Sequence, residues 1–128
     1  DPLGLRLRAA PNAQESNRTR RVRFMMDQTM NNDTEYLEAA NAKLDAIEAW
    51  ADEALPDADV SRQGNVLTLQ LEGGNEIVLN LQTPWHEIWL ASRLGGYHFR
   101  ERDGVWHDTR TDATLEEKLE EAVKTLTA

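Results

Sequence analysis

The sequence predicts an α+β domain, a two-layer sandwich in which two helices pack on one face of a five- to six-stranded antiparallel sheet. Three patterns predict this architecture. Apolar residues recur at helical spacing over residues 34–55, apolar and polar residues alternate through residues 66–107, and helical spacing returns over residues 114–126. Because the strands follow one another without intervening helices, both helices are expected on one face of a single sheet. The other face is expected to meet water.

The first helix is expected to begin at Asp33 or Thr34, either of which can cap its free amides. Pro56 ends it, because proline cannot continue the helical hydrogen bonds. Its apolar stripe recurs at three- and four-residue steps and consists of Leu37, Ala40, Leu44, Ile47, Ala51 and Ala54 with Leu55. Glu38, Asp45 and Asp52 project roughly opposite this stripe, so the helix is expected to present a carboxylate-rich face to water.

Strict alternation identifies the strands. It runs through residues 66–71, 76–82 and 86–91, and Gly73-Gly74, Gly95-Gly96 and Asp103-Gly104 supply the turns of an antiparallel meander. The residues predicted to face the core are Leu67, Leu69, Leu71, Ile77, Leu79, Leu81, Ile88 and Leu90. The sequence 114–117 forms a capping box for the second helix, because a threonine is followed three residues later by a glutamate.

The N-terminal segment differs from the remainder in charge. Residues 1–24 carry a net charge of +4, whereas residues 25–128 carry −13. With no hydrophobic period, residues 1–30 are predicted to be a disordered basic extension, and residues 31–128 form the folded domain. The extension resembles a mitochondrial transit peptide. The favoured alternative is sequence upstream of a true start at Met25, Met26 or Met30.

Composition excludes several classes of function. The 128 residues provide for one domain, and the absence of cysteine excludes disulfides, thiolate metal sites and a cysteine nucleophile. An acidic domain repels phosphates, so no nucleic acid partner is expected. No apolar run reaches the ~20 residues of a bilayer-spanning helix, so no membrane association is expected. Neither phosphate-binding loops nor hydrolase motifs occur, which predicts a protein that is not an enzyme.

Six carboxylates form the first candidate site. Between Lys43 and Arg62 no basic residue separates Asp45, Glu48, Asp52, Glu53, Asp57 and Asp59. Oxygen ligands without nitrogen or sulfur suit hard cations, and an open row of them predicts weak, exchangeable binding. The same acids could serve as an electrostatic docking surface. A solvated helix face without a ligand is the alternative.

The outer face of the sheet is the second candidate site. Alternation turns Thr68, Gln70, Val78, Asn80, Gln82, Glu87 and Trp89 away from the core. An outward tryptophan among amides is typical of an interface anchor, and an edge tryptophan covered by a loop is the alternative. His98 is expected to share this face. Structural or surface roles are expected for all three histidines.

Several motifs resemble those of the frataxin family. Residues 80–91, NLQTPWHEIWLA, resemble its sheet signature, and GGYHF at 95–99 with Trp106 resembles its bacterial branch. Residues 32–36 and 66–69 also fit, so the resemblance spans about residues 31–127. It implies a frataxin-like sandwich and a role in iron–sulfur cluster assembly.

The resemblance also implies site residues. It carries an iron-binding carboxylate ridge over to Glu48, Asp52, Glu53, Asp57 and Asp59, and a partner surface over to Asn80, Gln82 and Trp89. Glu87 stands where an amide is common. The expected partners are a cysteine desulfurase and an iron–sulfur scaffold protein, and the expected cargo is weakly bound Fe²⁺ or Fe³⁺. A bacterial cytoplasmic monomer is expected, with the mitochondrial matrix and iron-induced oligomers as alternatives. Ferroxidase or iron-storage activity is the alternative function.

Overall fold

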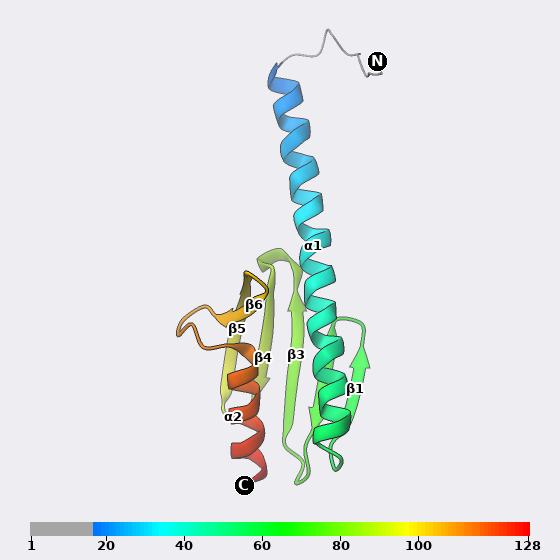
Figure 1. Ribbon diagram of the computed structural model, residues 1–128, viewed down its shortest axis with the longest axis vertical. Coiled ribbons are helices and arrows are strands. Elements are labelled where there is room, and N and C mark those ends of the chain that lie inside the picture. Colours follow the sequence, from blue (N-terminus) through cyan, green and yellow to red (C-terminus); the bar gives the residue numbers. More distant parts are fainter. Residues whose placement is uncertain (1–16) are drawn as a thin grey trace. The chain divides into compact units, whose positions relative to one another are not determined.

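The computed structural model describes the backbone of residues 17–128 and the side chains of residues 32–128. A helix, six strands and a second helix follow one another along the chain (Figure 1). The elements are α1 (Asn17–Ala54), β1 (Asp59–Gln63), β2 (Val66–Gln70), β3 (Glu76–Gln82), the 3₁₀ turn η2 (Thr83–Trp85), β4 (Glu87–Ser92), β5 (Gly95–Arg102), β6 (Val105–Asp108) and α2 (Leu115–Thr127). Neither helix, over the described residues, is long and apolar enough to cross a membrane.

The sheet is the predicted meander. All six strands are antiparallel and lie in the order β1-β2-β3-β4-β5-β6. Within residues 35–128, α1 and α2 cover one face of the sheet and leave the other uncovered by helices (Figure 1). The α+β sandwich expected from the sequence is confirmed.

The core fills the space between the helices and the inner face of the sheet. All eight inward strand residues that alternation predicts are at most 4% exposed. From α1, the buried residues of the stripe are Ala40, Leu44, Ile47 and Ala51, and from α2 they are Leu115, Leu119, Ala122 and Leu126. Phe99 and Trp106 close the core beneath β5 and β6. The capping box forms at Thr114, whose side chain accepts a hydrogen bond from the amide of Glu117.

The start of α1 differs from the expectation. The helix begins at Asn17 rather than at Asp33 or Thr34, so residues 17–30 are helical where the sequence pattern predicted disorder. Residues 17–32 contain neither glycine nor proline and are rich in arginine and methionine, so nothing in them breaks a helix that the packed part of α1 has nucleated. Residues 1–16 lie outside the described residues. The chain divides into two units, 1–34 and 35–128, and the domain boundary near residue 30 stays a prediction.

Alternation did not reveal β1, because Val60 is its only apolar residue. The strand pairs with β2 so that Asp59 lies opposite Gln70 and Arg62 lies opposite the buried Leu67. Side chains of directly paired residues share a face of the sheet. Asp59 therefore lies on the outer face, whereas Arg62 lies on the face that the helices cover.

Candidate metal-binding ridge and docking face

The acidic ridge, defined as Asp45, Glu48, Asp52, Glu53, Asp57 and Asp59, follows the C-terminal half of α1 into β1. All six side chains reach solvent, and Glu48 is the one that is half-buried. The helix presents them because its apolar stripe is turned to the core. Pro56 then ends α1 and places Asp57 and Asp59 on the way into the first strand.

Arg62 neutralises one end of the ridge. Its Nη1 donates to Asp45 Oδ1 at 2.8 Å and lies 3.6 Å from Glu48 Oε1. Its Nη2 donates to Asn41 Oδ1 at 2.8 Å, and its Nε donates to the carbonyl of Gly64. The sequence suggested a row of acids without a compensating base, but the β1–β2 hairpin returns a guanidinium to this row.

The ridge therefore has two parts. Asp45 and Glu48 are paired with Arg62, whereas Asp52, Glu53, Asp57 and Asp59 make no hydrogen bond or ion pair with other described side chains. Within residues 32–128, no three histidine or acidic side chains converge closely enough to form a metal cage. Such an arrangement is an open row of hard oxygen donors, which provides charge for a cation but no fixed coordination geometry.

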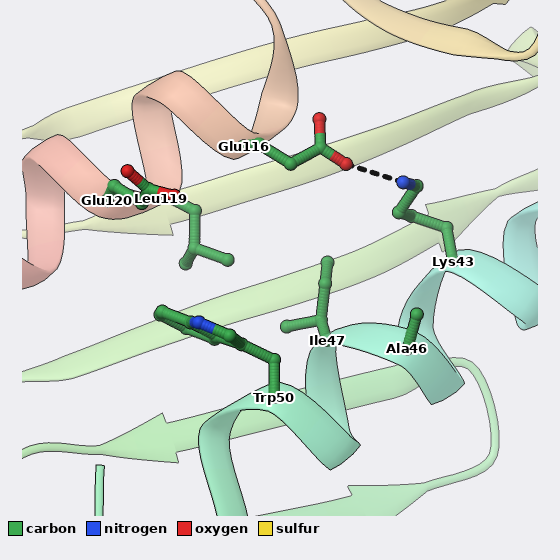
Figure 2. A pocket seen from close by; sticks show the side chains of 7 residues that line it. All are labelled: Lys43, Ala46, Ile47, Trp50, Glu116, Leu119 and Glu120. Atoms are coloured by element: carbon green, nitrogen blue, oxygen red, sulfur yellow. Dashed lines mark hydrogen bonds and ion pairs between the residues drawn. The ribbon is translucent and has the colours of Figure 1, made fainter. Parts of the chain in front are cut away.

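A groove lies between the two helices, and none of the six ridge residues lines it. Its cavity of about 190 Å³ is lined mainly by the apolar side chains of Ile47, Trp50 and Leu119 (Figure 2). One end is closed by the ion pair between Lys43 Nζ and Glu116 Oε2 at 2.5 Å. Burial alone would raise the pKa of Glu116, but the hydrogen bond and positive charge of Lys43 outweigh burial and hold that pKa below its ordinary value.

The predicted partner surface, which we call the docking face, comprises Asn80, Gln82, Glu87 and Trp89 on the outer face of the sheet. The register brings them together, because Asn80 pairs with Trp89 and Gln82 pairs with Glu87 across β3 and β4. Trp89 is half-buried rather than fully exposed. Its ring stacks on His98 of β5, with ring centroids 4.2 Å apart and an interplanar angle of 8°.

Glu87 departs from the expectation of an exposed carboxylate, since its side chain is only 8% exposed. Oε1 accepts a hydrogen bond from the indole Nε1 of Trp89 at 2.8 Å, and Oε2 accepts one from Arg100 Nη2 at 2.6 Å. His98 Nδ1 lies 3.7 Å from Oε1. Glu87 is buried because its neighbours on β4 and β5 cover and satisfy both oxygens, as a buried carboxylate requires.

Sequence reasoning missed Arg100 as part of this face. Its pairing with Glu87 depends on the register of β4 with β5, where the two residues lie directly opposite. The available signal was the alternation of His98, Arg100 and Arg102, which places all three on one side of β5. The predicted position of His98 on the outer face is confirmed by its stack with Trp89.

Aromatic residues also occupy the connection from β3 to β4. Trp85 ends η2 and is 60% exposed, whereas the next residue, His86, adopts a left-handed conformation with φ of 54°. The ring of His86 stacks on that of Tyr36 at 5.0 Å. Tyr36 donates from its buried hydroxyl to the carbonyl of Glu87 at 2.6 Å. Burial is the main cause that raises the pKa of Tyr36 to about 12, and the charge of Glu87 adds to it.

Comparison with known proteins identifies the family of this chain. The family model of the frataxin-like domain matches residues 29–128. The iron-sulfur cluster assembly protein CyaY of Paraburkholderia phymatum is 51% identical over 89 residues, which cover 70% of this chain and 85% of that protein. The protein of the same name from Vibrio cholerae is 45% identical over 84 residues, covering 66% of this chain and 81% of its own length.

Solved structures agree with the fold. Frataxin from Psychromonas ingrahamii superposes with a TM-score of 0.70 at 30% identity, covering 73% of this chain and 90% of that one. Trimeric frataxin from Saccharomyces cerevisiae, complexed with ferrous iron, gives a TM-score of 0.54 at 34% identity, covering 73% and 82%. The match over residues 29–128, together with these relatives, shows that the chain belongs to the frataxin family, on its bacterial CyaY branch.

Proposed function

We propose that the protein acts in iron–sulfur cluster assembly, where it binds iron weakly on the acidic ridge and docks on a cysteine desulfurase–scaffold complex. The observation that carries this proposal is the group of four ridge carboxylates, Asp52, Glu53, Asp57 and Asp59, that have no ionic partner among the described residues. Its relatives of 45–51% identity are named for cluster assembly, which supports the same role here. We place this activity in the bacterial cytoplasm.

Iron is the cargo of the protein in this proposal. Carboxylate oxygens suit Fe²⁺ and Fe³⁺, and yeast frataxin complexed with ferrous iron is a structural neighbour. Because the four unpaired acids are exposed and no cage forms among the described residues, the metal would keep most of its water and exchange readily. A weak, exchangeable site is suited to presenting iron to an acceptor rather than storing it.

The ridge carboxylates of α1 and the docking face lie on different surfaces of the domain, whereas Asp59 lies on the same outer face of the sheet as the docking face. We propose that the ridge contacts a basic surface of the desulfurase and that Trp89 with its flanking amides contacts the scaffold. Unpaired exposed acids attract a basic partner over distances of about a Debye length, ~8 Å at physiological salt. An indole on an open sheet contributes contact area at small entropic cost.

An anaerobic Fe²⁺ titration followed by NMR line broadening tests the iron site. Broadening is expected at residues 45–59. The ridge variant Asp52→Asn/Glu53→Gln/Asp57→Asn/Asp59→Asn should remove most of it. The matched control neutralises four exposed acids elsewhere, Glu72→Gln, Glu101→Gln, Asp103→Asn and Glu120→Gln. Equal loss of iron affinity in both variants would show that net charge, rather than the ridge, attracts the metal.

A further inference from the structure

The outer face of the sheet carries opposite charges on its two sides. On the side of β1 to β3, Gln70 pairs with both Asp59 and Glu76, which places the two carboxylates in one row across three strands. These residues line a polar hollow of about 340 Å³, and none of the described side chains that line it is basic. On the other side, β5 presents Arg100 and Arg102, and the docking face lies between the two sides.

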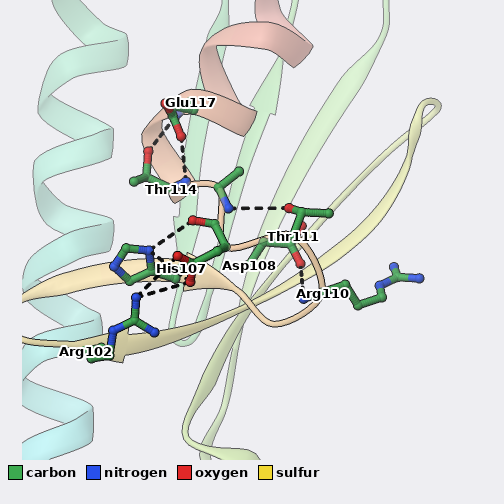
Figure 3. A network of polar contacts seen from close by, with 9 residues as sticks. Arg102, His107, Asp108, Arg110, Thr111, Thr114 and Glu117 are labelled. Carbon is green, nitrogen blue, oxygen red and sulfur yellow. Dashed lines mark hydrogen bonds and ion pairs between the residues drawn. The ribbon is translucent and has the colours of Figure 1, made fainter.

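The two arginines are held in place but retain free hydrogen-bonding capacity. Arg100 uses one terminal nitrogen for Glu87. Arg102 uses one terminal nitrogen for Asp112, which also lies 3.7 Å from His107 (Figure 3). Their side chains are 60% and 62% exposed. A guanidinium has five N–H donors in a planar fork that matches a carboxylate, so both residues can accept a second acid from outside.

The surroundings of these arginines define what they can bind. Next to Arg100 lies the stacked pair of Trp89 and His98, a flat and partly apolar surface. Glu87, the acid nearest to Arg100, is buried and already bonded on both oxygens. At this point of an otherwise acidic domain, the guanidinium of Arg100 is accessible while its acidic partner is buried, whereas Arg102 has an exposed partner in Asp112. A polyanion such as nucleic acid would meet the repulsion of residues 25–128, which carry −13, whereas a local pair of carboxylates on a protein would not.

We infer that Arg100 and Arg102 dock carboxylates of the partner protein that covers the sheet face, beside an apolar group seated on Trp89 and His98. The inference rests on the proposed function, because it concerns the complex formed there. The partner would be acidic opposite β5 and basic opposite the ridge and β1. Only one orientation satisfies both, so the charge arrangement sets how the complex is oriented as well as how fast it forms.

The direction in which Arg102→Glu changes the affinity for the partner tests this inference. A uniformly basic partner would bind more tightly when an arginine of this face becomes acidic, whereas a partner with carboxylates opposite β5 would bind more weakly. Binding to a purified cysteine desulfurase–scaffold complex is measured by calorimetry at fixed salt. Arg102→Glu should weaken it about five- to tenfold and Arg102→Gln about two- to threefold, the range expected when an exposed charge pair is reversed or removed.

Lys124→Glu is the matched control, because it changes the net charge equally on α2, away from the sheet face. It should change affinity less than about twofold, and thermal midpoints of all variants confirm folding. Unchanged or tighter binding of Arg102→Glu overturns the inference while leaving the proposed function intact. Absence of binding by the wild-type protein overturns both. A wild-type dimer in sedimentation that Arg102→Glu dissolves, without an effect on the complex, would identify a second copy as the occupant and also overturn the inference.

Discussion

Arg62 on β1 donates to Asp45 on α1, with 2.8 Å between Nη1 and Oδ1, and so ties the edge of the sheet to the first helix through a ridge carboxylate. The same guanidinium holds Asn41, one helical turn earlier, through Nη2. Its side chain is 18% exposed, so these bonds form in a partly desolvated setting. The contact stabilises the fold at the expense of negative charge on the ridge.

Replacement of Arg62 should therefore separate stability from iron binding. Arg62→Gln loses three hydrogen-bonded partners and should lower the free energy of unfolding by about 1–3 kcal/mol, measured by urea denaturation. It releases Asp45 and Glu48, so the Fe²⁺ affinity of the ridge should rise. The exposed turn residue Arg93 provides the control, since Arg93→Gln changes charge equally. If Arg62→Gln raises the affinity no more than the control does, the two released acids do not bind iron.

Although Trp89 lies on the outer face of the sheet, its replacement should lower the free energy of unfolding. Trp89→Ala removes the stack on His98 and leaves Oε1 of the buried Glu87 without its indole donor. An unsatisfied buried acceptor costs about 1–3 kcal/mol. The double variant Trp89→Ala/Glu87→Gln should recover part of this loss in a urea denaturation series. Recovery would be absent if the lost stability came from the stack alone.

Trp106 is the control for the two faces of the sheet, because it is 3% exposed on the core side. Trp106→Ala should lower the free energy of unfolding by about 3–5 kcal/mol, the range for truncating a buried aromatic residue. This loss should be the same whether residue 87 is glutamate or glutamine. A smaller loss from Trp106→Ala than from Trp89→Ala would contradict the assignment of inner and outer faces.

The sequence alone predicted the parts of the molecule that depend on local pattern. Alternation identified the inward residues of β2 to β4, and the capping box located the start of α2. The sequence pattern could not predict that Arg62 pairs with Asp45, 17 residues away. That contact depends on a hairpin whose first strand has one apolar residue. The burial of Glu87 also depends on a contact that is distant in the sequence, with Arg100 of the neighbouring strand. Alternation gives the side of a strand on which a residue lies, whereas burial depends on the neighbouring strands.

Acid should weaken the contact between Lys43 and Glu116. Because the pKa of Glu116 is lowered in the folded protein, its stabilising contribution is present above its ordinary pKa and is lost as pH falls through the folded value. Lys43→Met should therefore reduce stability at neutral pH, and the difference from wild type should shrink at acidic pH, measured by urea denaturation. Glu120→Gln, on the same groove, is the control. A difference that stays constant with pH would mean that Lys43 acts through packing only.

Alkali should act on Tyr36, whose pKa is raised to about 12 chiefly by burial. The folded protein thus holds a proton that the unfolded chain releases near the ordinary tyrosine pKa of about 10, so stability falls as pH rises between these two values. At about 1.4 kcal/mol per pKa unit, this contribution is on the order of 2–3 kcal/mol. Tyr36→Phe lacks it, and lacks the hydrogen bond to the carbonyl of Glu87 at every pH.

The measurement compares free energies of unfolding of wild type and Tyr36→Phe at pH 9, 10 and 11. The difference cancels all groups that the two proteins share, including the second tyrosine, Tyr97. Wild type should lose stability relative to the variant as pH rises, because only wild type must keep a buried phenol protonated. Tyr97→Phe, which leaves Tyr36 as the one tyrosine, should follow wild type. If the difference between wild type and Tyr36→Phe does not change with pH, the hydroxyl of Tyr36 titrates alike in the folded and unfolded chains, and its burial against Glu87 has no electrostatic consequence.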